Sequence, residues 1–127
     1  MSKSGFRELK VWQKSRDIAV LIYNSTNSSS FNKDFGLRDQ MRRSAVSISS
    51  NIAEGDERET DREAVRFFYI AKGSSAELLS QSIIAQQIGY LDQEGFSQIE
   101  RQCLEVSGML SRLISARAKT FNMSKSL

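Results

Sequence analysis

Residues 40–55 have the sequence QMRRSAVSISSNIAEG, and their apolar side chains recur with the period of an α-helix. Side chains three and four residues apart lie along one face of a helix. The pattern therefore predicts an amphipathic helix over residues 34–54, with Gly55 as the glycine that ends it. Its apolar face carries Leu37, Met41, Ala45, Ile48 and Ile52.

The same periodicity elsewhere predicts three more helices, over about residues 6–25, 61–88 and 93–119. We expect residues 25–30, STNSSS, to form a loop, because serine and asparagine side chains compete for backbone hydrogen bonds, and residues 120–127 to form a tail. No internal linker divides the chain, so residues 1–127 are expected to form one domain. The fold predicted is all-α, an up-down-up-down antiparallel four-helix bundle.

Local signals place the ends of these helices. Thr60 and Glu63 have the spacing of a capping box, in which the threonine hydroxyl accepts from the N3 amide and the glutamate carboxylate from the N-cap amide. Gly89 is placed to end the third helix. The expected N-caps of the other helices are Asn32 or Asp34 for the second, and Asp92 for the fourth.

The composition argues against an enzyme. The chain has 127 residues, one cysteine, no proline and no histidine, so the commonest general base and the usual zinc ligand are both missing. Cys103 lies on the apolar face of its predicted helix, where a thiol usually fills the core. The carboxylates between Glu54 and Glu63 match no metal-binding loop. We expect no catalytic residue, no metal and no cofactor.

Helix 34–54 also carries a polar arc beside its apolar face. Serine and asparagine are poor helix formers, so a row of them in a long helix implies compensating contacts. We expect close contact with another helix or subunit, and a tolerated exposed face is the alternative. The arc consists of Gln40, Arg43, Ser44, Ser47, Asn51 and Glu54.

The run from Phe67 to Ala71 has more apolar residues than one buried stripe needs, since four consecutive positions cover the circumference of a helix. A second interface, most simply in a homo-oligomer, is one interpretation, and an unusually buried helix is the other. The small residues Gly73–Ala76 favour close approach of a neighbouring helix. The expected oligomer interface comprises Phe68, Tyr69, Ile70, Ser47 and Asn51.

The net charge is +3, and many basic residues recur at helical spacings. Such stripes can neutralise the phosphates of a nucleic acid, although amphipathic helices often have basic outer faces. The pattern shows no exposed aromatic residue among them for base stacking. The candidate nucleic-acid-binding residues are Arg42, Arg43, Arg38, Lys10, Lys14, Arg101, Arg112 and Lys119.

The stretch Gln40–Gly55 also resembles the signature Q-x-R-R-A-x-x-S-I-x-x-N-I-A-E-G of bacterial four-helix-bundle proteins encoded in 23S rRNA intervening sequences. The segments Phe6–Gln13, Phe68–Leu78 and Gly89–Leu91 are similar to that family as well. The resemblance extends over Phe6–Lys119. The sequence departs from it at Asn32, where proline is common, and at Ser44, where alanine is usual.

The resemblance implies a cytoplasmic homopentamer, often described as ribosomal protein-like. It also implies similarity to the accessory variability determinant of diversity-generating retroelements, a basic pentamer that binds nucleic acid and a reverse transcriptase. The sequence contains no run long and apolar enough for a membrane span, and no membrane partner is expected. We therefore expect a non-enzymatic, oligomeric RNA- or DNA-binding accessory protein. The alternative is an oligomeric helical scaffold that binds only protein partners.

Overall fold

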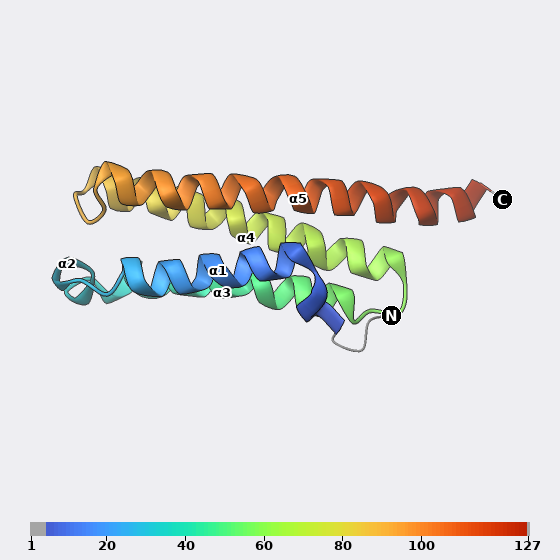
Figure 1. Cartoon of the computed structure of the whole chain (residues 1–127), viewed down its shortest axis with the longest axis horizontal. Coiled ribbons are helices and arrows are strands. Elements are labelled where there is room, and N and C mark those ends of the chain that lie inside the picture. The colour runs from blue at the N-terminus through green and yellow to red at the C-terminus, as the bar shows by residue number, and fades with distance from the viewer. Residues whose placement is uncertain (1–4, 127) are drawn as a thin grey trace.

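Four long α-helices make up almost the whole chain (Figure 1). The structure is a computed structural model that describes the backbone of residues 5–126 and the side chains of residues 5–121. The long helices are α1 (Lys10–Ser25), α3 (Phe35–Asp56), α4 (Asp61–Gln87) and α5 (Gln93–Ser126). The 3₁₀-helix η1 (Gly5–Glu8) precedes them, and the one-turn helix α2 (Ser29–Asn32) connects α1 to α3. Since residues 5–126 contain no strand, the all-α prediction is confirmed.

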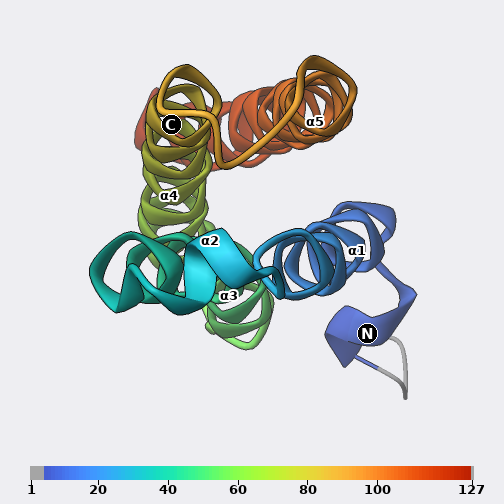
Figure 2. The same ribbon diagram turned by 90° about the vertical axis from the view of Figure 1, so that its left-hand side faces the viewer.

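Consecutive long helices run in opposite directions, so the bundle is up-down-up-down (Figure 1). The end-on view shows the four helices around one centre (Figure 2). Helix α3 packs against α1 and α4, α4 packs against α5, and α5 returns to contact α1. None of the helices in the described part of the chain combines the length and apolar character needed to cross a lipid bilayer.

The interior of the bundle is filled by the apolar faces that the sequence periodicity predicts. All five residues of the predicted seam on α3 take part, four of them fully buried and Leu37 packed at the edge of the core. Each long helix contributes large buried side chains, which exclude water from a single continuous core. Among the largest of these side chains are Ile18, Ile22, Met41, Ile48, Ile52, Phe68, Leu78, Ile99 and Leu110.

Three of the expected N-caps are present. The Asp34 carboxylate accepts from the amide of Leu37 at 3.2 Å, and the Asp92 carboxylate accepts from the amide of Gly95 at 2.7 Å. The Thr60 hydroxyl accepts from the amide of Glu63 at 3.2 Å. The second half of the expected capping box is wrong, because the Glu63 carboxylate accepts from the Thr60 hydroxyl and not from its amide.

The two glycines expected to end helices have different roles. Gly89 has φ +86°, and the amides of Gly89 and Tyr90 donate to the carbonyls of Gln86 and Ala85, which is the Schellman arrangement. The expectation for Gly55 is wrong, since α3 continues through it to Asp56. Gly55 is buried, and its position has no space for a side chain, because a Cβ atom there would lie 2.7 Å from the Phe68 ring.

Two segments expected to be irregular are helical. Residues 29–30 begin α2, whose Phe31 is fully buried and ties this connection to the core. Helix α5 continues to Ser126, through most of the predicted tail; residue 127 lies outside the described residues. No glycine or proline interrupts residues 120–126, and Phe121 packs against the core and under the Arg62 guanidinium at 5.0 Å.

The contact at Gly55 predicts the effect of adding one methyl group. Gly55→Ala should lower the free energy of unfolding by about 1–3 kcal/mol, because the buried Phe68 ring and the α4 backbone cannot move away easily. The matched variant Gly108→Ala, also inside a helix, should raise it by about 0.5–1 kcal/mol, since its Cβ meets only the Arg112 guanidinium at 3.6 Å. Urea unfolding of both variants is the measurement, and equal effects at the two sites would contradict the packing argument.

Candidate nucleic-acid interface

The polar arc of α3 faces α4 within the same chain. The Ser44 hydroxyl donates to the Glu77 carboxylate at 3.0 Å, and the hydroxyls of Ser47 and Ser74 are 2.9 Å apart. The Asn51 amide donates to the backbone carbonyl and the hydroxyl of Ser47 at 2.8 and 3.0 Å. Of the two contacts left open by the sequence, the structure shows the one with another helix for Ser44 and Ser47, whereas Asn51 bonds within α3 itself. None of these hydrogen bonds needs a second subunit.

The eight candidate basic residues fall in three places. Arg38, Arg42 and Arg43 lie in the first half of α3. Two lysines of α1 and two arginines of α5 line hollows between those helices, and they are Lys10, Lys14, Arg101 and Arg112. Lys119 is exposed farther along α5. The structure thus separates the candidates into two main groups and one isolated lysine.

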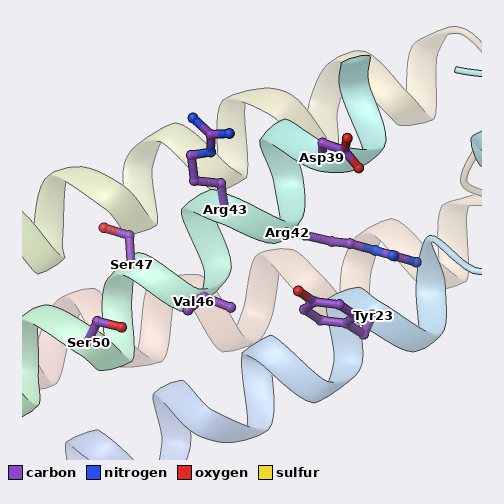
Figure 3. Close-up of a pocket in the computed structure, with 7 residues that line it drawn as sticks. All are labelled: Tyr23, Asp39, Arg42, Arg43, Val46, Ser47 and Ser50. Atoms are coloured by element: carbon purple, nitrogen blue, oxygen red, sulfur yellow. The ribbon is translucent and has the colours of Figure 1, made fainter. Parts of the chain in front are cut away.

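Arg42 is held in place by two contacts at the end of α1, one with its C-cap Thr26 and one with Tyr23, and Figure 3 shows Arg42 beside Tyr23. Its Nε atom donates to the Thr26 hydroxyl at 2.9 Å, and its guanidinium carbon lies 4.6 Å from the centre of the Tyr23 ring. Thr26 is fully buried and its hydroxyl donates to the Ile22 carbonyl at 2.7 Å, so its orientation is fixed. Arg42 makes no ion pair with any described carboxylate, which leaves its outer nitrogen atoms free for an anionic ligand.

Arg42 and Arg43 line one open pocket of about 550 Å³. Figure 3 shows the two guanidinium groups pointing in different directions, Arg42 toward Tyr23 on α1 and Arg43 away from it. Arg43 is exposed and, like Arg42, pairs with no carboxylate among residues 5–121. The pocket is completed by Tyr23, Asp39, Val46, Ser47 and Ser50.

Arg38 differs from its neighbours because its charge is already matched. Its Nε atom donates to the Asp39 carboxylate at 3.1 Å, and one Nη atom reaches the Asn32 side-chain oxygen at 3.4 Å. Its guanidinium also lies 4.6 Å from the centre of the Phe35 ring. We infer that Arg38 neutralises phosphate less well than Arg42 or Arg43.

The two hollows between α1 and α5 differ in character, since one is lined by charges of both signs and the other is mainly apolar. Lys14 forms an ion pair with Glu105 at 2.8 Å, and the hydrogen bond to this carboxylate raises the pKa of Lys14. Arg101 lies beside this pair without an ion pair of its own in the described chain. Closer to the start of α1, Lys10 and Arg112 flank an apolar hollow of about 330 Å³, lined by Leu9, Val11, Met109 and Leu113.

The residues expected in an oligomer interface occupy different environments. Phe68 is fully buried inside its own bundle, so the expectation is wrong for its side chain, which cannot contact a second subunit. Tyr69 and Ile70 are 58% and 43% exposed. They lie on the outer face of α4, because each residue advances the helix by about 100° from buried Phe68.

Cys103 is placed where a thiol is unreactive. Its side chain is 1% exposed, and burial raises the pKa of Cys103 to about 11. In the part of the chain that the structure describes, no three cysteine or carboxylate side chains come together in a way that could hold a metal ion. In the acidic turn, the Arg58 guanidinium neutralises two of the carboxylates, pairing with Glu54 at 3.1 Å and with Glu63 at 4.0 Å.

Sequence reasoning missed the exposed aromatic residues of this region. Tyr23 is one of the periodically spaced apolar residues of α1, which form a wide arc on that helix, yet it is 46% exposed, and Phe35 is 60% exposed. Tyr23 lies at the edge of a wide arc, and Phe35 is the first residue of α3, so neither position is enclosed by neighbouring helices. The sequence offers only a weak signal: Phe35 lies three residues before Arg38, and Tyr23 lies three residues before Thr26, which accepts a hydrogen bond from Arg42.

Comparisons with known proteins agree with the geometry of the bundle. A family model described as 23S rRNA-intervening sequence protein matches residues 7–112. The fold is similar to the 1.70 Å crystal structure of a protein with unknown function from the S23 ribosomal protein family of Bacteroides thetaiotaomicron VPI-5482, with a TM-score of 0.77 and 25% sequence identity. That match covers 82% of this chain and 97% of the other. No curated protein matches the chain.

The environment of Cys103 predicts slow thiol chemistry in the folded protein. Because the pKa of Cys103 is raised from the ordinary thiol value of 9.0 to about 11, the thiolate fraction at pH 8 should be about a hundredfold lower than that of an exposed cysteine, and burial slows access further. Labelling with a disulfide reagent should therefore be slow in native protein and fast in urea. Rapid native labelling at pH 8 would show that the thiol is neither buried nor protonated.

Proposed function

Because the chain belongs to the 23S rRNA-intervening sequence protein family, we propose that it is a non-enzymatic accessory protein that binds the phosphate backbone of RNA or DNA as an oligomer. The carrying observation is the pocket of α3, where Arg42 and Arg43 stand side by side in sequence without any described carboxylate partner. Guanidinium groups in such positions can displace the cations condensed on the phosphates of a nucleic acid, and the release of these counterions favours binding. Arg101 and Arg112 supply further charge between α1 and α5.

The distribution of ion pairs supports phosphate contacts by particular arginines. Arg16, Arg38, Arg58 and Arg117 each pair with a carboxylate, at distances from 3.0 to 3.1 Å for the shortest contact. The four arginines proposed to bind make no such pair with the described residues, so approach of a phosphate requires no ion pair to break. They are Arg42, Arg43, Arg101 and Arg112.

Oligomerisation is the second part of the proposal, and the outer face of α4 supports it. Five large apolar residues, four on this helix and one at its C-cap, are 40–58% exposed, and no described segment of the chain covers them. Three small exposed residues lie among them at spacings of three and four: Gly73, Ala76 and Ser80. A Cβ atom at Gly73 would meet nothing within 4 Å, so this glycine is not needed for packing within the chain. The large residues are Tyr69, Ile70, Ile83, Ile84 and Ile88.

We propose a second copy of this chain as the partner for that face. A long apolar surface is costly in water, and small residues at its centre allow two helix backbones to approach closely. The family resemblance favours a homopentamer. In a ring, each arginine cluster is repeated, so one long nucleic acid can contact several subunits and gain avidity without any new type of contact.

Binding through the phosphate backbone of a nucleic acid predicts an affinity that falls steeply with salt concentration. Each neutralised phosphate contributes roughly 0.7 to 0.9 to the slope of log affinity against log salt. Arg42→Ala/Arg43→Ala should lower that slope by about two for every copy in contact, for RNA and for DNA. The matched control Arg58→Ala removes an ion-paired arginine and should leave the slope unchanged. Salt titrations with mixed-sequence RNA and DNA are the measurement.

The outcomes of these titrations separate the two interpretations of function. If the parent protein binds neither RNA nor DNA at low salt, the alternative of a scaffold for protein partners replaces the proposal. If binding persists at high salt with strong sequence preference, the backbone mechanism is wrong. Absorbance at 260 nm in purified protein, removed by high salt, would be further support.

If the exposed apolar face of α4 binds a second copy, the protein in solution should have the mass of an oligomer. Sedimentation equilibrium at micromolar concentration should give an oligomer for the parent, and Ile84→Asp or Ile70→Asp should shift it toward the monomer, because a buried unpaired carboxylate is costly. Leu104→Asp, at a 58% exposed position on α5, is the matched control and should leave the mass unchanged. A monomeric parent would rule out oligomerisation, and an unchanged mass in both isoleucine variants would place the interface elsewhere.

A further inference from the structure

Two arginine–aromatic pairs lie one helical turn apart along α3. The Arg42 guanidinium carbon is 4.6 Å from the centre of the Tyr23 ring, and that of Arg38 is 4.6 Å from the centre of the Phe35 ring. Arg38 and Arg42 are four residues apart, which places them on the same face of the helix about 6 Å apart along its axis. We call these four residues the arginine–aromatic strip.

Both rings of the strip are open to solvent. Tyr23 is 46% exposed and Phe35 is 60% exposed, whereas Phe31 and Phe68 are fully buried in the core. Large aromatic surfaces gain free energy when a flat partner covers them. A ring beside a guanidinium plane is the surface on which unpaired nucleobases stack.

The guanidinium groups of the strip are fixed before any ligand arrives. Arg42 is held by Thr26, and Arg38 is held by Asp39 and Asn32. A ligand therefore meets two ordered planes and loses less side-chain entropy on binding. The strip also adjoins the pocket that contains Arg43, whose free guanidinium is available to the phosphate beside a stacked base.

We infer that the arginine–aromatic strip binds two successive unpaired nucleotides of a single strand, with one base on the Tyr23–Arg42 pair and one on the Phe35–Arg38 pair. This inference rests on the proposed nucleic-acid binding and adds to it a preference for single strands. In a duplex, each base is already stacked between its neighbours and cannot present its face to a protein ring. Phosphate contacts alone create no such preference.

A third arginine–aromatic pair provides a matched control. The Arg58 guanidinium carbon lies 4.4 Å from the centre of the Phe67 ring, so the local contact is the same. This arginine, however, pairs with two carboxylates, Glu54 and Glu63, whereas Arg38 pairs with one and Arg42 with none in the described chain. The Phe67 ring is also less exposed than the rings of Tyr23 and Phe35, and the surrounding carboxylates repel phosphate. The pair should not bind a nucleotide.

The test compares leucine variants on two probes, a 12-nucleotide mixed-sequence RNA and a blunt duplex of the same sequence. Tyr23→Leu and Phe35→Leu should each weaken binding to the single strand by about fivefold to a hundredfold, with little change for the duplex, because only stacking is lost. Tyr23→Phe should retain binding, since the ring remains. Phe67→Leu should change neither affinity. Circular dichroism and unfolding midpoints verify that the variants fold.

A photochemical experiment with the unmodified protein gives an independent readout. Single-stranded RNA containing 5-iodouridine should cross-link to the peptides that contain Tyr23 and Phe35, and mass spectrometry can locate the adducts. Cross-links confined to other peptides would overturn the inference, as would equal losses of single-strand and duplex affinity in the leucine variants. These results leave the proposed backbone binding intact, whereas a parent that binds neither probe at low salt overturns both proposals.

Discussion

Close packing of α3 against α4 is the constraint on which the rest of the structure depends. Small side chains line both helices at this contact, and the hydroxyl groups among them satisfy one another across it, as in the 2.9 Å contact between Ser47 and Ser74. Each such hydrogen bond contributes only about 1 kcal/mol net. Leaving a buried hydroxyl without a partner costs more, so the pairing also fixes the register of the two helices. Gly55, against the Phe68 ring, keeps them close at the end of α3.

That register determines what each helix presents to solvent. Because the apolar seam of α3 faces the core and Ser44 and Ser47 bond to α4, Arg42 is left on the side that faces α1, and Arg43 is exposed and points away from α1. Helix α4 buries one face against α3 and α5, and its opposite face, with Tyr69 and Ile84, remains apolar and uncovered in the described chain. A basic surface and an apolar surface thus lie on different helices. The surfaces proposed to bind a phosphate backbone and a second subunit therefore do not overlap.

The side chains differ in how available they are for chemistry and for binding. Cys103 is buried and its pKa is raised, so it is a poor nucleophile at neutral pH, and the chain has no histidine to act as a base. The arginines of α3, by contrast, differ from one another in ways that suit distinct tasks. Arg38 has its charge matched by Asp39 and offers mainly a flat surface, whereas Arg42 offers both a flat surface and an unmatched charge. Such differences do not follow from residue type, since both are arginines on the same helix face.

The sequence by itself determined the helices and most of their ends, because periodicity and capping act between residues a few positions apart. The apolar seam from Leu37 to Ile52, the N-caps at Asp34 and Asp92, and the left-handed Gly89 all follow from such local rules. Only the tertiary structure decided that Phe68 is inside, that Gly55 gives space to a ring from α4, and that Tyr23 is exposed beside Arg42. These outcomes depend on which helix lies opposite each residue and on the position of that contact along the bundle axis. Such contacts join residues far apart in sequence, so no local pattern carries them.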